Sequence, residues 1–382
     1  MNKLKIIIKE ICLKFFYLIR NKKHKSVFFQ SFSGQYSDNP RAISEAIHEL
    51  DPSIDLVWYI KGETETPNYI KKVFGSKANI SQVQADAWVL NNGNAPSLGN
   101  YKGKNTFYVQ TWHGDRGFKR IGWSKGEEDG EKFESLYFDS HGIDLFTAGS
   151  SFAIKMFKEG FRYDGEIQLV GTPRNDKLVK LKEYGDDIKK IKHKLNIEKD
   201  VKVLLFAPTF RDNQNTLQDV SVDIPRCIDV LESVGEKWIC LLRSHCNSKG
   251  LDATYNAKMI DVTEFGDMAD LLLITDCLIT DYSSCSCDFI LTGKPCILAL
   301  FDEEEYKRPL WVTPQEAGFL CAMNQKELED ILLKLYSFNH KEIDDRILSF
   351  YETRETGNAS LITAQRVLDW INRSSANQKV LI

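Results

Sequence analysis

The sequence predicts an α/β protein of two Rossmann-like, doubly wound domains that face a cleft. The 382-residue chain is too long for one ordinary core and suits two domains. Short β-rich runs alternate with helical segments in two successive series, as expected for parallel sheets covered on both faces. Polar clusters follow the strands in both series, at the end where open α/β sheets bind ligands.

Composition narrows the class of protein. Hydrophobic residues make up 42% and charged residues 27%, which is typical of a globular chain. The net charge of -4 argues against a nucleic-acid partner, so any attraction to anions must be local. Most of the nine cysteines sit in apolar runs, as small core residues of a reduced cytoplasmic protein. Cys285 and Cys287 have no partners at zinc spacing, and we predict neither a metal site nor a cofactor.

Residues 1–25 are apolar and basic. Lys9 and Lys14 interrupt the apolar run, which argues against both a signal peptide and a membrane span. At helical spacing one face is apolar (Leu4, Ile7, Ile8, Ile11, Phe15 and Leu18), and the opposite face is basic (Lys5, Lys9 and Arg20). The basic cluster Lys22, Lys23 and Lys25 follows. We predict a helix lying on an anionic membrane surface, with a helix packed on its own domain as the alternative.

Residues 26–176 form the predicted N-terminal, acceptor-binding domain. Its strands are read from KSVFFQSF, IDLVWYIK, ADAWVLNNG, NTFYVQTW, IDLFTAGS and EIQLVGTP, and its helices include ISEAIHEL and FAIKMFKEG. Polar clusters at strand ends lie at residues 31–39, 113–120 and 171–176. Pro40 fits the first turn of a helix, and Asp176 is expected to cap the helix that follows it.

Residues 177–360 form the predicted C-terminal, nucleotide-binding domain. A charged helical stretch over 176–199 leads into a second strand series, VKVLLFAPTF, EKWICLLRSH, MIDVTEF, DCLITDYSS, KPCILAL and GFLCAM. Residues 361–382 are predicted as a C-terminal helix, for which packing back on the N-terminal domain is one option.

Three strand ends of the second series predict a pyrophosphate site. Asp281 ends a buried strand, and Ser283 and Ser284 then stand where a helix begins, whose free N–H groups hold phosphate. Simple helix capping by these serines is the alternative. The neighbouring strand ends carry Thr209 and Arg211, and Arg243 and His245; their cationic groups suit phosphate oxygens, although each alone could be a surface residue.

His113 follows an apolar strand in the first series. A lone histidine there is commonly structural, but Gly114 permits close approach of a ligand, and Arg116, Lys119 and Arg120 come next. This combination suits a base facing an anionic acceptor. Arg174, at the end of the last strand, is a further candidate for the cleft.

These segments together resemble the CDP-glycerol glycerophosphotransferase family, the primases and polymerases of teichoic acid and related capsular polymers. The resemblance spans roughly residues 26–372 and rests on ordered motifs: YSDNPRAI, QTWHG, VGTPRND, FAPTFRD, LRSH, DMADLLLITDCLITDYSS and DEEEY. It implies a glycosyltransferase-B fold and transfer of an alditol phosphate from a CDP carrier to a hydroxyl of a membrane-bound polymer, releasing CMP, at the cytoplasmic face of the membrane.

The resemblance also implies residue roles. His113 is the general base. Arg211, His245, Ser283 and Ser284, with Thr209, hold the pyrophosphate, and His245 is the second catalytic candidate. Arg243 and Asp281 are further candidates for binding the donor. Family members commonly read WHGTPLK where this chain has WHGDRGFK, and LRSHCNS lacks a common proline. These departures bear on the acceptor and the alditol, so glycerol or ribitol, and primase or polymerase, stay open. A nucleotide-sugar glycosyltransferase and an inactive polymer-binding module are the alternatives.

Overall fold

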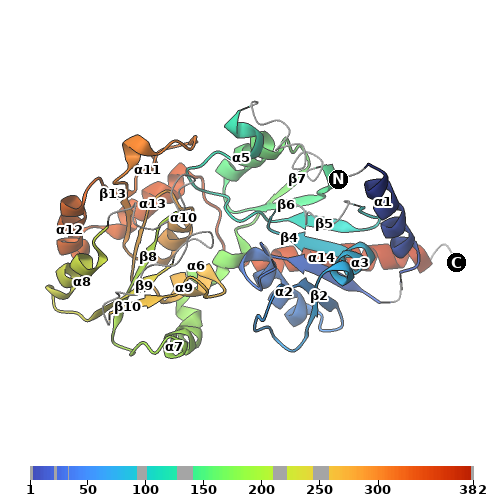
Figure 1. Cartoon of the computed structure of the whole chain (residues 1–382), viewed down its shortest axis with the longest axis horizontal. Helices are drawn as coiled ribbons and strands as arrows, with labels where there is room; N and C mark the ends of the chain where they lie inside the picture. The colour runs from blue at the N-terminus through green and yellow to red at the C-terminus, as the bar shows by residue number, and fades with distance from the viewer. Residues whose placement is uncertain are drawn as a thin grey trace. The chain divides into compact units, whose positions relative to one another are not determined.

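The computed structural model describes residues 3–20, 24–32, 34–92, 101–126, 141–209, 222–243 and 258–379. The chain divides into two compact units (Figure 1). The first comprises Met1–Asp115, Ile121–Asp176 and Arg354–Ile382, and the second comprises Arg116–Arg120 and Lys177–Thr353. Two of these limits differ from the sequence-based boundaries: the short segment Arg116–Arg120 joins the second unit, and the chain returns to the first unit at Arg354 rather than after residue 360.

The first unit is a parallel sheet in the order β3-β2-β1-β4-β5-β6-β7. Its strands are β1 (Ser26–Gln30), β2 (Asp55–Tyr59), β3 (Ile70–Val73), β4 (Ala87–Leu90), β5 (Phe107–Gln110), β6 (Leu145–Ala148) and β7 (Glu166–Leu169). Its helices are α1 (Lys3–Leu18), α2 (Asp38–Leu50), α3 (Ser76–Gln84), α5 (Ser151–Phe161) and α14 (Ala359–Lys379), with the 3₁₀ turns Gly122–Lys125 and Pro173–Asn175.

The second unit repeats this topology, in the order β10-β9-β8-β11-β12-β13. Its strands are β8 (Lys202–Ala207), β9 (Trp238–Leu242), β10 (Met259–Asp261), β11 (Cys277–Thr280), β12 (Cys296–Ala299) and β13 (Leu320–Ala322). Its helices are α7 (Gly185–Lys194), α8 (Ile224–Glu232), α9 (Met268–Ile274), α10 (Cys285–Phe289), α11 (Pro314–Ala317), α12 (Gln325–Leu333) and α13 (His340–Phe350). In both units the strand order reverses direction beside the first strand, which is the position where doubly wound sheets bind ligands.

Each sheet has its own apolar core. In the first unit, Val27, Phe29 and Val89 of the central strands pack with Val367 and Leu368 of α14, which lies beside α2 (Figure 1). The C-terminal helix therefore completes the core of the first unit. Asp176 fixes its start, since its carboxylate accepts hydrogen bonds from the backbone N–H groups of Ala359 (2.9 Å) and Ser360 (2.8 Å). The expectation that Asp176 caps the helix following it is corrected: it caps α14.

The charged stretch 176–199 is not one helix. It divides into α6 (Asp176–Val179), a 3₁₀ turn (Leu181–Tyr184) and α7, which begins at Gly185. Lys180 between the first two adopts a non-helical ψ of 32°, which interrupts the regular hydrogen-bond ladder.

Helix α1 packs on the first unit by one face only. Leu13 and Tyr17 are buried against Val83 of α3 and against Tyr101. Several other apolar side chains of the helix stay in solvent, with Ile11 64%, Phe15 57% and Leu18 65% exposed. The helix thus contacts its own domain and still presents an apolar surface. Over the part of the chain that the structure describes, no helix is both long enough and apolar enough to cross a membrane.

Candidate active site

His113 lies just beyond the end of β5, beside the point where the strand order of the first sheet reverses. Its Nδ1 is 2.8 Å from the backbone carbonyl oxygen of Asn91, which follows β4. A carbonyl oxygen only accepts hydrogen bonds, so Nδ1 carries the proton and Nε2 of the neutral ring keeps its lone pair. The imidazole packs against the rings of Trp112 and Phe32, at centroid distances of 4.1 and 5.4 Å. This is the tautomer and the fixed orientation that a general base requires.

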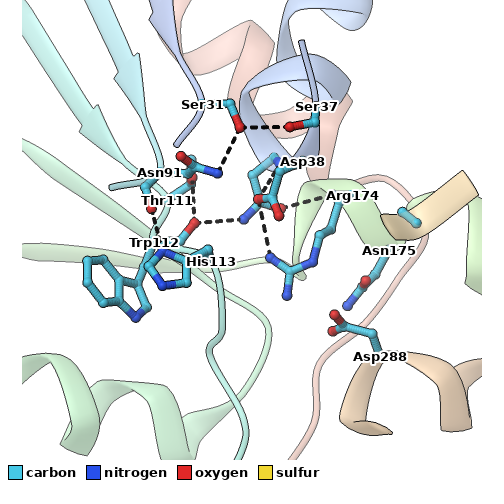
Figure 2. A network of polar contacts seen from close by, with 12 residues as sticks. Ser31, Ser37, Asp38, Asn91, Thr111, Trp112, His113, Arg174, Asn175 and Asp288 are labelled. Carbon is cyan, nitrogen blue, oxygen red and sulfur yellow. Dashed lines mark hydrogen bonds and ion pairs between the residues drawn. The ribbon is translucent and has the colours of Figure 1, made fainter. Parts of the chain in front are cut away.

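Asn91 ties the ends of β1 and β4 together. Its side-chain amide donates to the Ser31 hydroxyl (3.1 Å), and its side-chain oxygen accepts from the Phe32 backbone N–H (2.9 Å). The Ser31 hydroxyl also bonds the hydroxyl of Ser37, the residue before α2 (3.0 Å; Figure 2). The carbonyl that orients His113 is therefore held by side chains from two strands and a helix start.

A second set of contacts holds the backbone before His113. The buried Asn39 donates from its side-chain amide to the Trp112 carbonyl (3.1 Å) and accepts from the Arg174 backbone N–H (3.0 Å). The guanidinium of Arg174 pairs with Asp38 at 3.4 Å (Figure 2). Arg174 is buried, with 6% of it exposed. Its side chain contacts Asp38 and its backbone contacts Asn39, so it supports the backbone before His113 indirectly, through Asn39.

Three residues that are not glycine adopt positive φ around this histidine: Phe32 (44°), Asp38 (63°) and Trp112 (51°). Each such conformation costs on the order of 1–3 kcal/mol and persists only where neighbours enforce it. The strained residue beside the base is thus Trp112, whose carbonyl Asn39 holds. Backbone strain of this kind gathers at functional sites, and nothing in the amino-acid types signalled it.

Asp115 has a structural role. Its carboxylate accepts a 2.5 Å hydrogen bond from the Gly149 backbone N–H, and its own carbonyl accepts from the Ser150 hydroxyl (3.0 Å). Ser150 in turn caps α5. Asp115 therefore fixes the loop after His113 to the end of β6.

The corresponding reversal point of the second unit lies between β8 and β11. Thr209 donates to Asp281 twice, from its backbone N–H (2.9 Å) and from its hydroxyl (3.0 Å). Asp281 is 1% exposed and thus joins the two strand ends, whereas Thr209 is half-buried. The side chain of Asp281 therefore shapes the turn that carries the paired serines.

Ser283 and Ser284 follow at the start of α10. The Ser283 hydroxyl accepts from the Cys285 backbone N–H (3.4 Å), while Ser284 makes no capping bond through its side chain. Both serines are half-buried, and α10 is only five residues long, so a helix dipole adds little here. Any phosphate contact at this turn must come from hydroxyl and backbone N–H groups.

The remaining donor-side candidates lie in different settings. The Arg243 guanidinium is half-buried and donates to the Phe265 carbonyl (2.6 Å). Arg211 and His245 fall outside the described residues. Lys119 forms a backbone bridge with Leu310 of the second unit. Arg116 is only 2% exposed and pairs with Asp288, so its burial gives it a structural role in place of the predicted contact with an anionic acceptor.

The described cysteines of the second core are apolar packing residues. Burial raises the pKa of the Cys285 thiol to about 11 and that of Cys227 to about 12, so both stay protonated and unreactive near neutral pH. Among the described residues, no cluster of histidine, cysteine, aspartate and glutamate has the arrangement of a metal site.

Comparison with known proteins places the chain in a family. The model of the CDP-glycerol:poly(glycerophosphate) glycerophosphotransferases matches residues 12–347. The chain is 31% identical to the teichoic acid glycerol-phosphate transferase of Staphylococcus aureus over 80% of this chain and 82% of that protein. It is 30% identical to the teichoic acid poly(glycerol phosphate) polymerase of Staphylococcus epidermidis over 76% of this chain, but only 42% of that polymerase.

The fold is similar to that of a solved relative. The structure of the wall teichoic acid polymerase TagF superposes with a TM-score of 0.83 at 25% identity, covering 97% of this chain and 96% of that chain. Two parallel sheets with flanking helices, in the glycosyltransferase-B arrangement of strands, are common to both. The chain therefore belongs to the CDP-glycerol:poly(glycerophosphate) glycerophosphotransferase family.

Proposed function

We propose that the protein transfers glycerol phosphate, or a related alditol phosphate, from a CDP-linked donor to a hydroxyl group of a teichoic-acid or capsular-polymer acceptor, releasing CMP. The observation that carries this proposal is His113, whose Nδ1 is occupied by the Asn91 carbonyl and whose Nε2 is the basic nitrogen. Membership of the family supplies the reaction class.

In the proposed reaction, Nε2 of His113 takes the proton of the acceptor hydroxyl as its oxygen attacks the β-phosphorus of the donor. The new oxygen–phosphorus bond forms as the bond from that phosphorus to the bridging oxygen breaks, and the electron pair leaves with CMP. The positive charge that develops on the ring is favoured by the carbonyl that accepts from Nδ1. A base held in a strained, fully bonded loop needs little reorganisation before this step.

On the donor side we propose that the pyrophosphate contacts Ser283, Ser284 and Thr209. Arg243, and Arg211 and His245 outside the described residues, are the cationic partners carried over from the family motifs. Fixed donors of this kind stabilise the charge that builds on the phosphoryl oxygens and on departing CMP. Lys119 remains a candidate for the acceptor chain.

We further propose that the protein works at an anionic membrane surface, where a lipid-linked acceptor would be present. The support is α1, with its exposed apolar side chains Ile8, Ile11, Phe15 and Leu18. Burying each of these in lipid contributes about 1.5–3 kcal/mol, which is enough for reversible surface attachment.

The test is CMP release by the purified protein against CDP-glycerol, CDP-ribitol and several nucleotide sugars, with and without a glycerophosphate-primed lipid acceptor. We expect acceptor-dependent release from a CDP-alditol, and loss of release in His113→Ala with CDP-glycerol binding retained. Turnover of a nucleotide sugar alone would show the alternative, a glycosyltransferase of the same fold. Full activity in His113→Ala would remove the histidine from the mechanism.

A further inference from the structure

The segment that follows His113 is built into the second unit. Arg116–Arg120 belongs to that unit although the residues on both sides belong to the first. The Phe118 ring packs on Phe319, the Phe118 carbonyl accepts from the Trp311 backbone N–H (2.7 Å), and Arg120 stacks on the Trp311 ring. The segment is therefore anchored along its whole length, starting three residues after the base.

The first residue of this segment, Arg116, carries a buried charge that pairs with the helix following Ser283 and Ser284, which we call the serine turn. The Arg116 side chain is 1% exposed, and its guanidinium lies 3.5 Å from a carboxylate oxygen of Asp288, which is itself 7% exposed. Asp288 is the fourth residue of α10, the helix that begins directly after Ser284. Two buried opposite charges hold each other strongly, because separating them leaves each without water.

The next residue touches the turn itself. Gly117 has a φ of +145°, and a Cβ built on it would lie 3.2 Å from the Cβ of Ser284. Tyr351 donates from its hydroxyl to the Gly117 carbonyl (3.4 Å), which fixes the glycine against the serine. A glycine is thus required here on two grounds, its backbone conformation and the close approach of Ser284.

We infer that Arg116 is a positioning residue of the donor site: through Asp288 on one side and the Gly117–Ser284 contact on the other, it holds the serine turn in the geometry that receives the donor pyrophosphate. This role is distinct from a contact with the acceptor, from which the buried guanidinium is shielded. The inference rests on the proposed function, because it takes the serine turn as the place of the donor phosphates.

The test compares Arg116→Gln with Arg120→Gln, a matched control in the same segment that touches Trp311 and not the serine turn. CDP-glycerol binding is measured by calorimetry, acceptor KM by CMP release, and folding by thermal unfolding. We expect Arg116→Gln to weaken CDP-glycerol binding roughly tenfold, the scale of one charge-assisted contact, with acceptor KM within about twofold of wild type. Arg120→Gln should bind CDP-glycerol as wild type does.

Two further variants keep the inference testable where Arg116→Gln does not fold. Arg116→Lys keeps the buried charge but lacks the planar fork, and Gly117→Ala presses on Ser284 without touching the ion pair. Both should weaken CDP-glycerol binding. Unchanged donor binding in the folded variants, or a raised acceptor KM alone, overturns the inference while leaving the proposed function intact. A wild-type protein that binds no CDP-glycerol overturns both.

Discussion

Replacement of Asn39 tests whether the hydrogen bonds around Trp112 serve catalysis as well as folding. Asn39 is fully buried and joins the Trp112 carbonyl to the Arg174 backbone N–H. In Asn39→Ala both groups lose this partner, at about 1–3 kcal/mol for each that stays unsatisfied in the interior. Thr111 also donates to the Trp112 carbonyl (3.0 Å), so that group is partly compensated. We therefore expect a loss of about 2 kcal/mol in the free energy of unfolding.

The catalytic effect is expected to be separable from this loss. With Asn39 gone, Trp112 can relax from its φ of 51°, and His113 moves with it. A displacement of about 1 Å at a reacting group costs on the order of 100-fold in rate, so we expect kcat to fall by about 10- to 100-fold. Affinity for CDP-glycerol should not change, since the donor contacts proposed here lie in the second unit.

Asn39→Asp is the matched variant for this prediction. It keeps an acceptor for the Arg174 backbone N–H and removes the donor to Trp112, but it also buries a carboxylate against the Trp112 carbonyl. It should therefore lower kcat with a loss of stability at least as large as that of Asn39→Ala. Urea unfolding, steady-state CMP release and calorimetry of CDP-glycerol binding measure the three quantities. The reasoning is refuted if both variants turn over within twofold of wild type while unfolding at lower urea, because Asn39 would then serve the fold alone.

Three other perturbations follow from the structure and the sequence. Burial raises the pKa of Asp344 to about 7, so the folded chain holds this proton more tightly than the unfolded chain, and stability should fall as pH rises from about 4 through 7. Asp344→Asn should remove that dependence. The free energy of unfolding of the variant minus that of wild type should be up to about 4 kcal/mol more positive at pH 8 than at pH 4, as measured by urea unfolding. The same difference at both pH values contradicts this prediction. In α1, Phe15→Ser should weaken sedimentation with phosphatidylglycerol vesicles by about tenfold, whereas Leu333→Ser, an exposed leucine on α12, should not; equal binding by both would speak against the membrane role of α1. The sequence has no Asp-x-Asp cluster, so a chelator should leave CMP release unchanged, and loss of activity that magnesium restores would contradict this prediction.

Most strands could be predicted because a strand buried in a parallel sheet consists largely of apolar and β-branched residues. In the second unit all six strands of the sheet follow apolar runs recognised in the sequence, such as Cys277–Thr280 and Cys296–Ala299. The strand that sequence reasoning missed, β3, is an edge strand whose two lysines, Lys71 and Lys72, are exposed. An edge strand pairs with one neighbour only and is less covered by helices than a central strand. It therefore lacks the continuous apolar run of the central strands.

The roles of the charged residues could not be predicted in the same way. Arg116, Arg174 and Asp115 were visible as polar residues after strands, a position that suits a ligand and a buried partner equally. Their partners, such as Asp288 for Arg116 and Gly149 for Asp115, are distant in sequence and are brought close only by the fold. His113 was predictable as a candidate base, but its tautomer depends on a carbonyl 22 residues away.

Both units have a side-chain hydrogen bond at the same topological point, and it serves a different purpose in each. In each, a polar side chain after the fourth strand of the sheet series bonds across to the end of the first strand: Asn91 to Ser31 in one, and Asp281 to Thr209 in the other. In an open parallel sheet these two strand ends diverge, because the helices that follow them lie on opposite faces, and the backbone groups between them remain available to a ligand. In the first unit the bridge fixes the carbonyl that orients the base; in the second it fixes the turn that carries Ser283 and Ser284. A substitution at Asn91 should therefore lower the acceptor-dependent rate, whereas a substitution at Asp281 should lower the affinity for the donor.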